Sequence, residues 1–257
     1  MSLYQHFRQE EHAFIDLATD WKELVENEYR PKLTDFLDPR EQHILRSLIG
    51  EKETVSVAFS GGSLNAERKR ALIYPDYVTP EPDDFEVDVF EIHYPRKFVQ
   101  LEHPKILGSL MGLGLKRGKF GDILSDGGRY QIAVCKDIAD YIELNFTAVG
   151  KTEISLSKPA ETDRLEQREM WEEKMTTVSS LRLDVILKEA FHLSRAKTKP
   201  LIQNERVKVN WRPITDPSFS VEEKDMISVR GFGRVSLQSI EGETRKGRYR
   251  VMLAYPA

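Results

Sequence analysis

The chain has 257 residues and a formal net charge of −4, and 40% of its residues are hydrophobic and 31% charged. This length suffices for two or three domains, and the composition of an ordinary globular protein excludes wholesale disorder and fibrous repeats. Apolar runs are only a few residues long, so the sequence predicts neither a membrane span nor a secretion signal. The single cysteine, Cys135, cannot form an intramolecular disulfide, which is typical of the reducing cytoplasm.

Charge is distributed unevenly along the chain. Residues 178–257 contain 15 Lys and Arg against 9 Asp and Glu, a balance of +6. Residues 1–177 contain 23 basic against 33 acidic residues, a balance of −10. The whole-chain average therefore conceals a basic C-terminal third, which favours a polyanionic partner.

The first 80 residues predict an α/β lobe. Helical spacing of apolar residues and a proline after an N-capping aspartate mark two helices, and a proline-rich stretch marks a boundary near residue 80. The expected elements are a helix over 4–28, a helix from Pro39 stopped by Gly50, a strand over 54–59 and an apolar run over 71–74.

Residues 81–157 predict a second lobe with the element order βαββαβ. The expected elements are a strand over 86–94, a helix over 103–115, strands over 122–124 and 130–135, a helix over 138–149 and a strand over 153–156. This order is the ferredoxin-like plan, which RRM-like RNA-binding sheets share. Residues 158–178 hold many charges and few apolar positions, which predicts a solvated linker.

Residues 179–257 predict a small basic domain, which makes the whole chain an α+β protein. Leu183, Ile186, Leu187 and Ala190 lie on one face of a first helix. Ser194 is a suitable N-cap for a second helix, so Arg195 would stand at a helix N-terminus, where backbone N–H groups and the guanidinium together attract an anion. Asn204 is expected to close this helix in the left-handed conformation, with strands over 207–209 and 227–229 after it.

This region resembles the small RNA-binding domain named after ribosomal protein S-four, also called the alpha-L motif. The matching segments are Arg182-Leu183-Asp184, Ser194-Arg195, Leu201-Ile202, Val207-Lys208-Val209-Asn210 and Asp225-x-Ile227-x-Val229. Trp211 departs from a frequent glycine, and Pro200 lies inside the second helix. The resemblance implies that Arg182 and Arg195 contact phosphates of a structured RNA; the alternative for Arg195 is a helix-cap ion pair with Asp184. Further candidate contacts are Lys197, Lys199, Lys208, Asn210 and Arg212.

Two basic clusters interrupt the acidic N-terminal body. Arg68, Lys69 and Arg70 follow a glycine turn, and Lys116, Arg117 and Lys119 occupy a second turn. Concentrated positive charge on an acidic body favours RNA contact, with a solvated loop as the alternative.

The whole chain also resembles the YlmH family of Firmicutes. The segments that carry this resemblance are Gly61-Gly62, Ala66 to Ala71, Tyr74 to Tyr77, His103 to Gly114 and Gly121 to Ile123. The resemblance implies a cytoplasmic protein without known catalysis that contacts rRNA and tRNA on the large ribosomal subunit during quality control of stalled translation. We expect a monomer with no cofactor, no metal, no membrane partner and no small-molecule substrate.

Several fragments are similar to catalytic motifs but lack necessary residues. Ser60-Gly61-Gly62-Ser63 is similar to the loop of ATP pyrophosphatases without its Asp-Ser pair. Arg182-Leu183-Asp184 is similar to the segment holding the pseudouridine synthase nucleophile, but Val185-Ile186 follows it. A non-catalytic RNA-binding protein is therefore our first hypothesis. An RNA-modifying enzyme docked through its C-terminal domain and a protein-binding adaptor are the alternatives.

Overall fold

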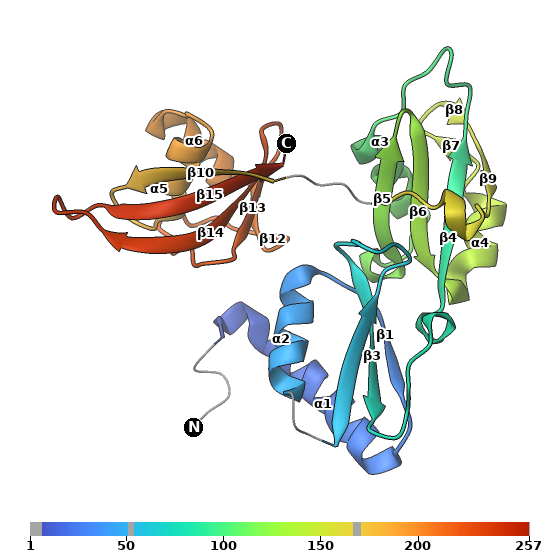
Figure 1. The fold of residues 1–257 in the computed structure, drawn as a ribbon. Helices are drawn as coiled ribbons and strands as arrows, with labels where there is room; N and C mark the ends of the chain where they lie inside the picture. Colours follow the sequence, from blue (N-terminus) through green and yellow to red (C-terminus); the bar gives the residue numbers. More distant parts are fainter. Residues whose placement is uncertain (1–6, 51–53, 167–170, 257) are drawn as a thin grey trace. The chain divides into compact units, whose positions relative to one another are not determined.

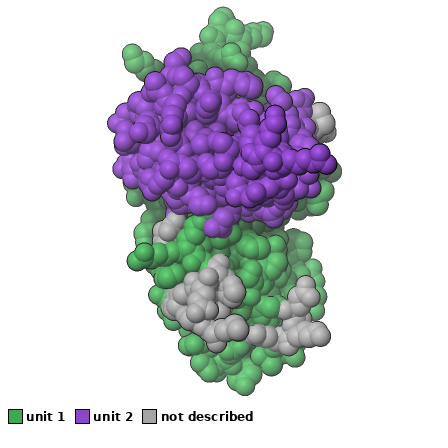
Figure 2. All heavy atoms as spheres, turned by 90° about the vertical axis from the view of Figure 1, so that its left-hand side faces the viewer, with its two compact units in different colours: residues 1–167 green, residues 168–257 purple. Residues whose placement is uncertain are grey.

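The computed structural model of the chain describes residues 7–50, 54–166 and 171–256 (Figure 1). The chain divides into two compact units, residues 1–167 and 168–257, which are coloured separately in Figure 2. No helix among the described residues is both long enough and apolar enough to cross a bilayer.

The first lobe of the N-terminal unit is a three-stranded antiparallel sheet, in the order β1-β3-β2, with two helices. Its elements are η2 (Gln9–Glu11), α1 (His12–Glu28), β1 (Lys32–Leu37), α2 (Pro39–Ile49), β2 (Val55–Ser60) and β3 (Lys69–Pro75). The predicted start of α2 is confirmed: Asp38 caps it by accepting from the Glu41 backbone N–H at 2.9 Å, and Pro39 occupies its first position. Ile15, Leu45 and Ile73 are fully buried in the core between helices and sheet.

The second lobe is a four-stranded antiparallel sheet in the order β5-β6-β4-β9. Its elements are η3 (Pro82–Phe85), β4 (Val87–His93), α3 (His103–Met111), η4 (Arg117–Lys119), β5 (Phe120–Asp126), β6 (Arg129–Cys135), η5 (Lys136–Ile138), α4 (Ala139–Asn145), β7 (Ala148–Val149), β8 (Thr152–Glu153), β9 (Ser155–Ser157) and η6 (Glu161–Asp163). The succession β4-α3-β5-β6-α4-β9 is βαββαβ, and Ile106 of α3 and Ile142 of α4 share a core with Phe90.

The opposite face of this sheet is occupied by the rest of the N-terminal unit. A Cβ atom on Gly62 would lie 2.8 Å from Val87 Cγ1, and one on Gly121 would lie 2.7 Å from the Phe36 ring, so both glycines permit close approach of the first lobe. The buried Leu165 donates its backbone N–H to Gln131 Oε1 at 2.8 Å. RRM-like sheets stack bases on an open face. In this chain Phe36, Gly62 and Leu165 cover the corresponding face.

The segment 158–178, predicted to be a linker, is largely structured. Gln131 donates to the Asp163 carbonyl at 2.9 Å, which ties the first part of the segment to the central sheet. Residues 171–178 form strand β10, which pairs with β15 along its whole length. Residues 167–170 lie outside the described ranges. The prediction was wrong because an edge strand with exposed charged side chains has the composition of a linker.

The C-terminal unit is a six-stranded antiparallel sheet with two helices, in the order β10-β15-β14-β13-β11-β12. Its elements are β10 (Trp171–Val178), α5 (Leu183–Ala190), α6 (Arg195–Gln203), β11 (Val207–Val209), β12 (Arg212–Pro213), β13 (Met226–Val229), β14 (Gly233–Glu243) and β15 (Tyr249–Pro256). The apolar face predicted for α5 is buried in one core with residues of β11, β13 and β14. Pro200 does not end α6, which runs to Gln203. Asn204 has a φ of −95°, and the left-handed residue is Glu205 at 55°, so the closure predicted for Asn204 was wrong by one position.

Candidate nucleic-acid interface

A buried carboxylate holds the first predicted RNA-binding arginine in place. The Asp184 side chain, in the first turn of α5, is only 1% exposed. Arg182, the residue before α5, donates from Nε to Asp184 Oδ1 at 3.0 Å and from Nη2 to Oδ2 at 3.1 Å. The hydrogen bonds to Asp184 raise the pKa of Arg182 above its usual value. This two-point contact fixes the orientation of the guanidinium while leaving part of it in solvent.

The second arginine approaches the same carboxylate from a different helix. Arg195 is the first residue of α6, and its Nη2 lies 3.9 Å from Asp184 Oδ2. Its side chain is 74% exposed, so the ion pair considered from the sequence exists only as a long contact. Two guanidinium groups therefore converge beside one buried negative charge. The remaining positive charge stands at two helix N-termini, where the helix dipoles also favour an anion.

The other predicted contacts of this unit lie on two elements. Lys197 and Lys199 are exposed in α6, the helix that begins with Arg195. Lys208 is exposed on β11, and Arg212 is half-buried on the neighbouring strand β12. These cations extend positive charge from the helices to the sheet edge.

Arg182 and Arg195 both lie within a segment that matches a known domain. Residues 181–227 match the S4 domain, and residues 80–163 match the family model described as "Putative RNA-binding domain in YlmH". A Bacillus subtilis (strain 168) protein named "Ribosome-associated protein quality control protein P2" is 49% identical over 249 residues, covering 97% of this chain and 96% of the relative. The chain belongs to the YlmH family.

A solved structure gives the same assignment for part of the fold. The structure titled "Cell division protein ylmH from Streptococcus pneumoniae" matches with a TM-score of 0.55 and 36% identity, covering 64% of this chain and all of that one. Two RNA-binding domains within one chain make this YlmH-family member an RNA-binding protein.

One residue of the S4 motif, Asn210, has a structural role in this YlmH-family protein. Its side chain is buried, donates to Asp225 Oδ1 at 2.7 Å and accepts from the Met226 backbone N–H at 3.0 Å. Asn210 and Trp211 both have positive φ, at 47° and 66°, in the tight turn that joins β11 to β12. Asn210 was predicted to contact RNA, but its buried amide bonds within the protein and closes this turn.

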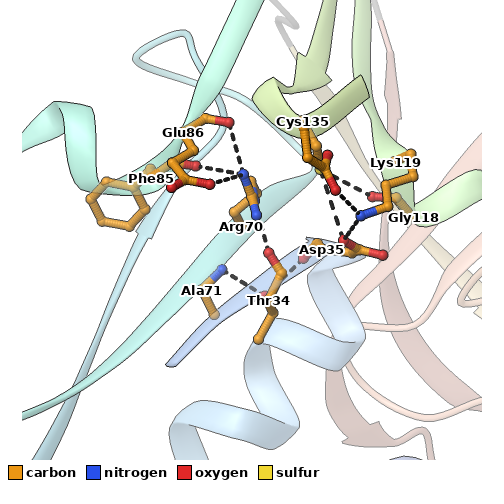
Figure 3. Close-up of polar contacts among 10 residues, drawn as sticks. Thr34, Asp35, Arg70, Ala71, Phe85, Glu86, Gly118, Lys119 and Cys135 are labelled. Atoms are coloured by element: carbon orange, nitrogen blue, oxygen red, sulfur yellow. Dashed lines mark hydrogen bonds and ion pairs between the residues drawn. The ribbon is translucent and has the colours of Figure 1, made fainter. Parts of the chain in front are cut away.

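Two arginines of the first N-terminal cluster are also internal. Arg70, 5% exposed, donates to the carbonyls of Thr34, Phe85 and Glu86 at 2.7–3.0 Å (Figure 3). Arg68 is buried too, and its Nη2 donates to the Phe36 carbonyl at 2.8 Å. Neither side chain can reach a phosphate, so the prediction for these two was wrong. Only Lys69 of this cluster keeps partial exposure.

The second N-terminal cluster also uses two of its charges internally. Arg117 is half-buried and donates to the Phe120 carbonyl, and its burial lowers its pKa to about 10. Lys119 lies between Asp35 at 2.8 Å and Asp137 at 2.6 Å (Figure 3). Burial disfavours the charged form of Lys119, but the hydrogen bonds to Asp137 and Asp35 outweigh it and raise the pKa. Lys116 alone among the three is exposed.

The single cysteine is part of the core, as its sequence context predicts. Cys135 ends β6 and is fully buried (Figure 3). Burial raises its pKa to about 11, so the thiol is protonated at neutral pH and is a weak nucleophile. Among the described residues, no three His, Cys, Asp or Glu side chains are grouped to hold a metal.

Proposed function

We propose that this protein binds RNA without catalysing a reaction, contacting rRNA and tRNA on the large ribosomal subunit during quality control of stalled translation. The convergence of Arg182 and Arg195 on the buried Asp184 carries the proposal. The name of the Bacillus subtilis relative supports the ribosomal setting and a cytoplasmic location. Arg182 and Arg195 are the main phosphate contacts of this proposal, and the chain acts as a monomer. The peripheral contacts are Lys69, Lys116, Lys197, Lys199, Lys208 and Arg212.

The geometry favours a phosphate contact over a purely structural ion pair. Exposed ion pairs contribute about 0–1 kcal/mol, and a 3.9 Å contact from a largely exposed Arg195 belongs at the low end of that range. Arg182, in contrast, is oriented by two hydrogen bonds and presents its remaining donors to solvent. An oriented guanidinium suits phosphate, which it can bind through two parallel hydrogen bonds.

The same carboxylate argues against an RNA-modifying enzyme of the pseudouridine synthase type. A nucleophilic aspartate must be accessible to a nucleobase. Asp184, at the corresponding position of the motif, is 1% exposed and accepts two hydrogen bonds from Arg182. These features support a binding role for the motif.

Co-sedimentation with large ribosomal subunits tests the proposal. Replacing Arg182 and Arg195 together by alanine should release the protein from the subunits. Arg182→Ala leaves the buried Asp184 without its closest partner and should destabilise the fold. Arg195→Ala alone is therefore the variant that should disturb folding least. It should weaken co-sedimentation at unchanged stability.

The matched control is Arg245→Ala with Lys246→Ala, which removes two exposed positive charges from the segment between β14 and β15. It should sediment like the wild type. Unchanged co-sedimentation of both arginine variants would overturn the site assignment. A change in the mass of RNA nucleosides that depends on the protein would overturn the non-catalytic role.

A further inference from the structure

The turn between β13 and β14 presents an aromatic ring flanked by arginines. Its sequence is Arg230-Gly231-Phe232-Gly233-Arg234, here named the RGFGR turn, and it lies beyond residue 227, where the S4 match ends. Phe232 is 47% exposed. Its ring centroid lies 6.2 Å from that of Phe191 at an interplanar angle of 63°, an edge contact. Phe232 therefore packs against Phe191 while nearly half of its surface remains in solvent.

The RGFGR turn has a defined backbone conformation. Gly231 and Gly233 have φ values of 87° and 108°, which favour glycine, and the Phe232 N–H donates to the Val229 carbonyl at 3.0 Å. A Cβ atom added to either glycine would meet no atom within 4 Å. Crowding therefore does not explain these glycines, which their positive φ values favour, and the space next to each of them is open.

Basic residues flank Phe232 in the turn and on the strands next to it. The Arg230 N–H donates to the Arg206 carbonyl at 2.9 Å, which joins the turn to the start of β11. Ser228 pairs with Lys208 on one side and with Arg234 on the other, so three adjacent strands place these residues in one row on the same sheet face. Residues 206–214 and 226–240 contain no Asp or Glu. These segments therefore carry basic and no acidic side chains, although the exposed Glu205 directly precedes Arg206.

We propose that the RGFGR turn is a second RNA contact, which binds an unpaired base by stacking it on Phe232 while Arg206 and Arg230 contact the flanking phosphates. The inference rests on the proposed function in taking RNA as the ligand. Stacking on an aromatic ring is tolerant of base identity, and Phe232 offers no hydrogen bond that could read a base. The turn therefore selects unpaired over paired RNA without selecting sequence. A protein interface would need a broader apolar surface than one ring among cations.

Binding to two RNA probes tests this inference with the full chain. One probe is a stem–loop with a fluorescent adenine analogue in its loop, and the other is a blunt duplex of the same stem. The wild type should bind the stem–loop more tightly and quench its fluorescence by stacking. Phe232→Leu, which keeps apolar contact with Phe191, should weaken stem–loop binding about 10-fold, abolish quenching and leave duplex binding unchanged. Phe232→Tyr should retain both the affinity and the quenching.

The matched control is Phe98→Leu, which removes a more exposed phenylalanine that also follows basic residues, Arg96 and Lys97. It should behave as the wild type. Equal losses in Phe98→Leu and Phe232→Leu, or no loss in Phe232→Leu, would overturn the role of the RGFGR turn. Weaker binding of both probes by Arg195→Ala would uphold the proposed function independently. If Arg195→Ala has no effect while Phe232→Leu weakens binding to the stem–loop, the RGFGR turn contacts RNA and the proposed arginine site is wrong.

Discussion

Arginines of the two units serve opposite purposes, although both groups stand in basic segments of the sequence. Arg70 of the N-terminal unit points inward and donates to three backbone carbonyls. Arg195 of the C-terminal unit begins a helix and is mostly in solvent. Arg70 lies on the mostly buried strand β3 and Arg68 directly precedes it, and both side chains are buried, whereas a basic residue at a helix N-terminus can reach solvent. Position within an element therefore decides whether a basic side chain is accessible to a ligand.

The largest expected effect in this comparison is that of Arg70→Ala. The change leaves the carbonyls of Thr34, Phe85 and Glu86 without their donor and opens a cavity, so we expect a loss of about 3–5 kcal/mol in the free energy of unfolding. Urea denaturation measures it. Lys69→Ala, at the half-buried neighbouring position, is the control and should cost less than 1 kcal/mol. If Arg70→Ala has normal stability but binds RNA poorly, Arg70 contacts RNA and is not a structural residue.

Contact between the two N-terminal lobes should produce the next effect. Alanine at Gly121 would press its Cβ to 2.7 Å from the Phe36 ring and 2.9 Å from Ala133 Cβ. We expect a loss of about 1–3 kcal/mol from this overpacking, with no change in the RNA affinity of the folded protein. Gly108→Ala is the matched control, since Gly108 lies inside α3 with no atom within 4 Å of the added carbon. That change should stabilise the protein by up to about 1 kcal/mol, as measured by thermal unfolding.

The sequence predicts elements with uninterrupted periodicity and misses those whose pattern is broken. Helices α2 and α5 are predicted because a capping pair and an apolar face define them locally. Strand β1 was missed because its register shifts between Leu33 and Phe36, which breaks the alternation of apolar residues. Two such shifts interrupt the pairing of β14 with β15, so that long hairpin was also missed. The alternation of apolar and polar residues therefore reveals only the part of a strand whose pairing is regular.

Motif spacing locates the candidate site but not its chemistry. The positions of Arg182 and Arg195 follow from the motif, whereas the burial of Asp184 between them depends on tertiary contacts such as its backbone bond to the Pro217 carbonyl. The neighbouring sequence does not distinguish Arg68 and Arg70 from exposed arginines, because the carbonyls that accept their hydrogen bonds lie far away in the sequence. The RGFGR turn lies outside the segment that matches the S4 domain, and the packing of its exposed ring against Phe191 is a tertiary contact that the sequence does not reveal.

An ion-pair cluster on the central sheet should make stability depend on pH. Hydrogen bonds from Arg129, against the opposing effect of burial, lower the pKa of the buried Glu91 to about 2. A lowered carboxyl pKa contributes stability that is present above its usual value of about 4.5 and is lost as the pH falls toward 2. Glu91→Gln should therefore cost about 1–2 kcal/mol at pH 7, with the difference from the wild type shrinking below pH 4.5.

Urea midpoints of the wild type and Glu91→Gln across this pH range check the prediction. Glu102→Gln removes an exposed carboxylate that lies 3.1 Å from Lys105, and it should change stability by no more than about 0.5 kcal/mol at any pH. If the stability difference between the wild type and Glu91→Gln stays constant down to pH 2, the ion pair with Arg129 does not lower the pKa of Glu91, and the prediction is wrong.

Arg195→Ala should cause the smallest change in stability. It tests directly whether Arg195, unlike Arg70, has no structural role. Its side chain makes one long contact, so the free energy of unfolding should stay within about 0.5 kcal/mol of the wild type. If Arg195 contacts one phosphate, the slope of log affinity against log salt should decrease by about 0.7–0.9 for the stem–loop and duplex probes. Binding titrations over a range of salt concentrations measure this slope. A variant with a large loss of stability and an unchanged slope would make Arg195 a structural residue like Arg70.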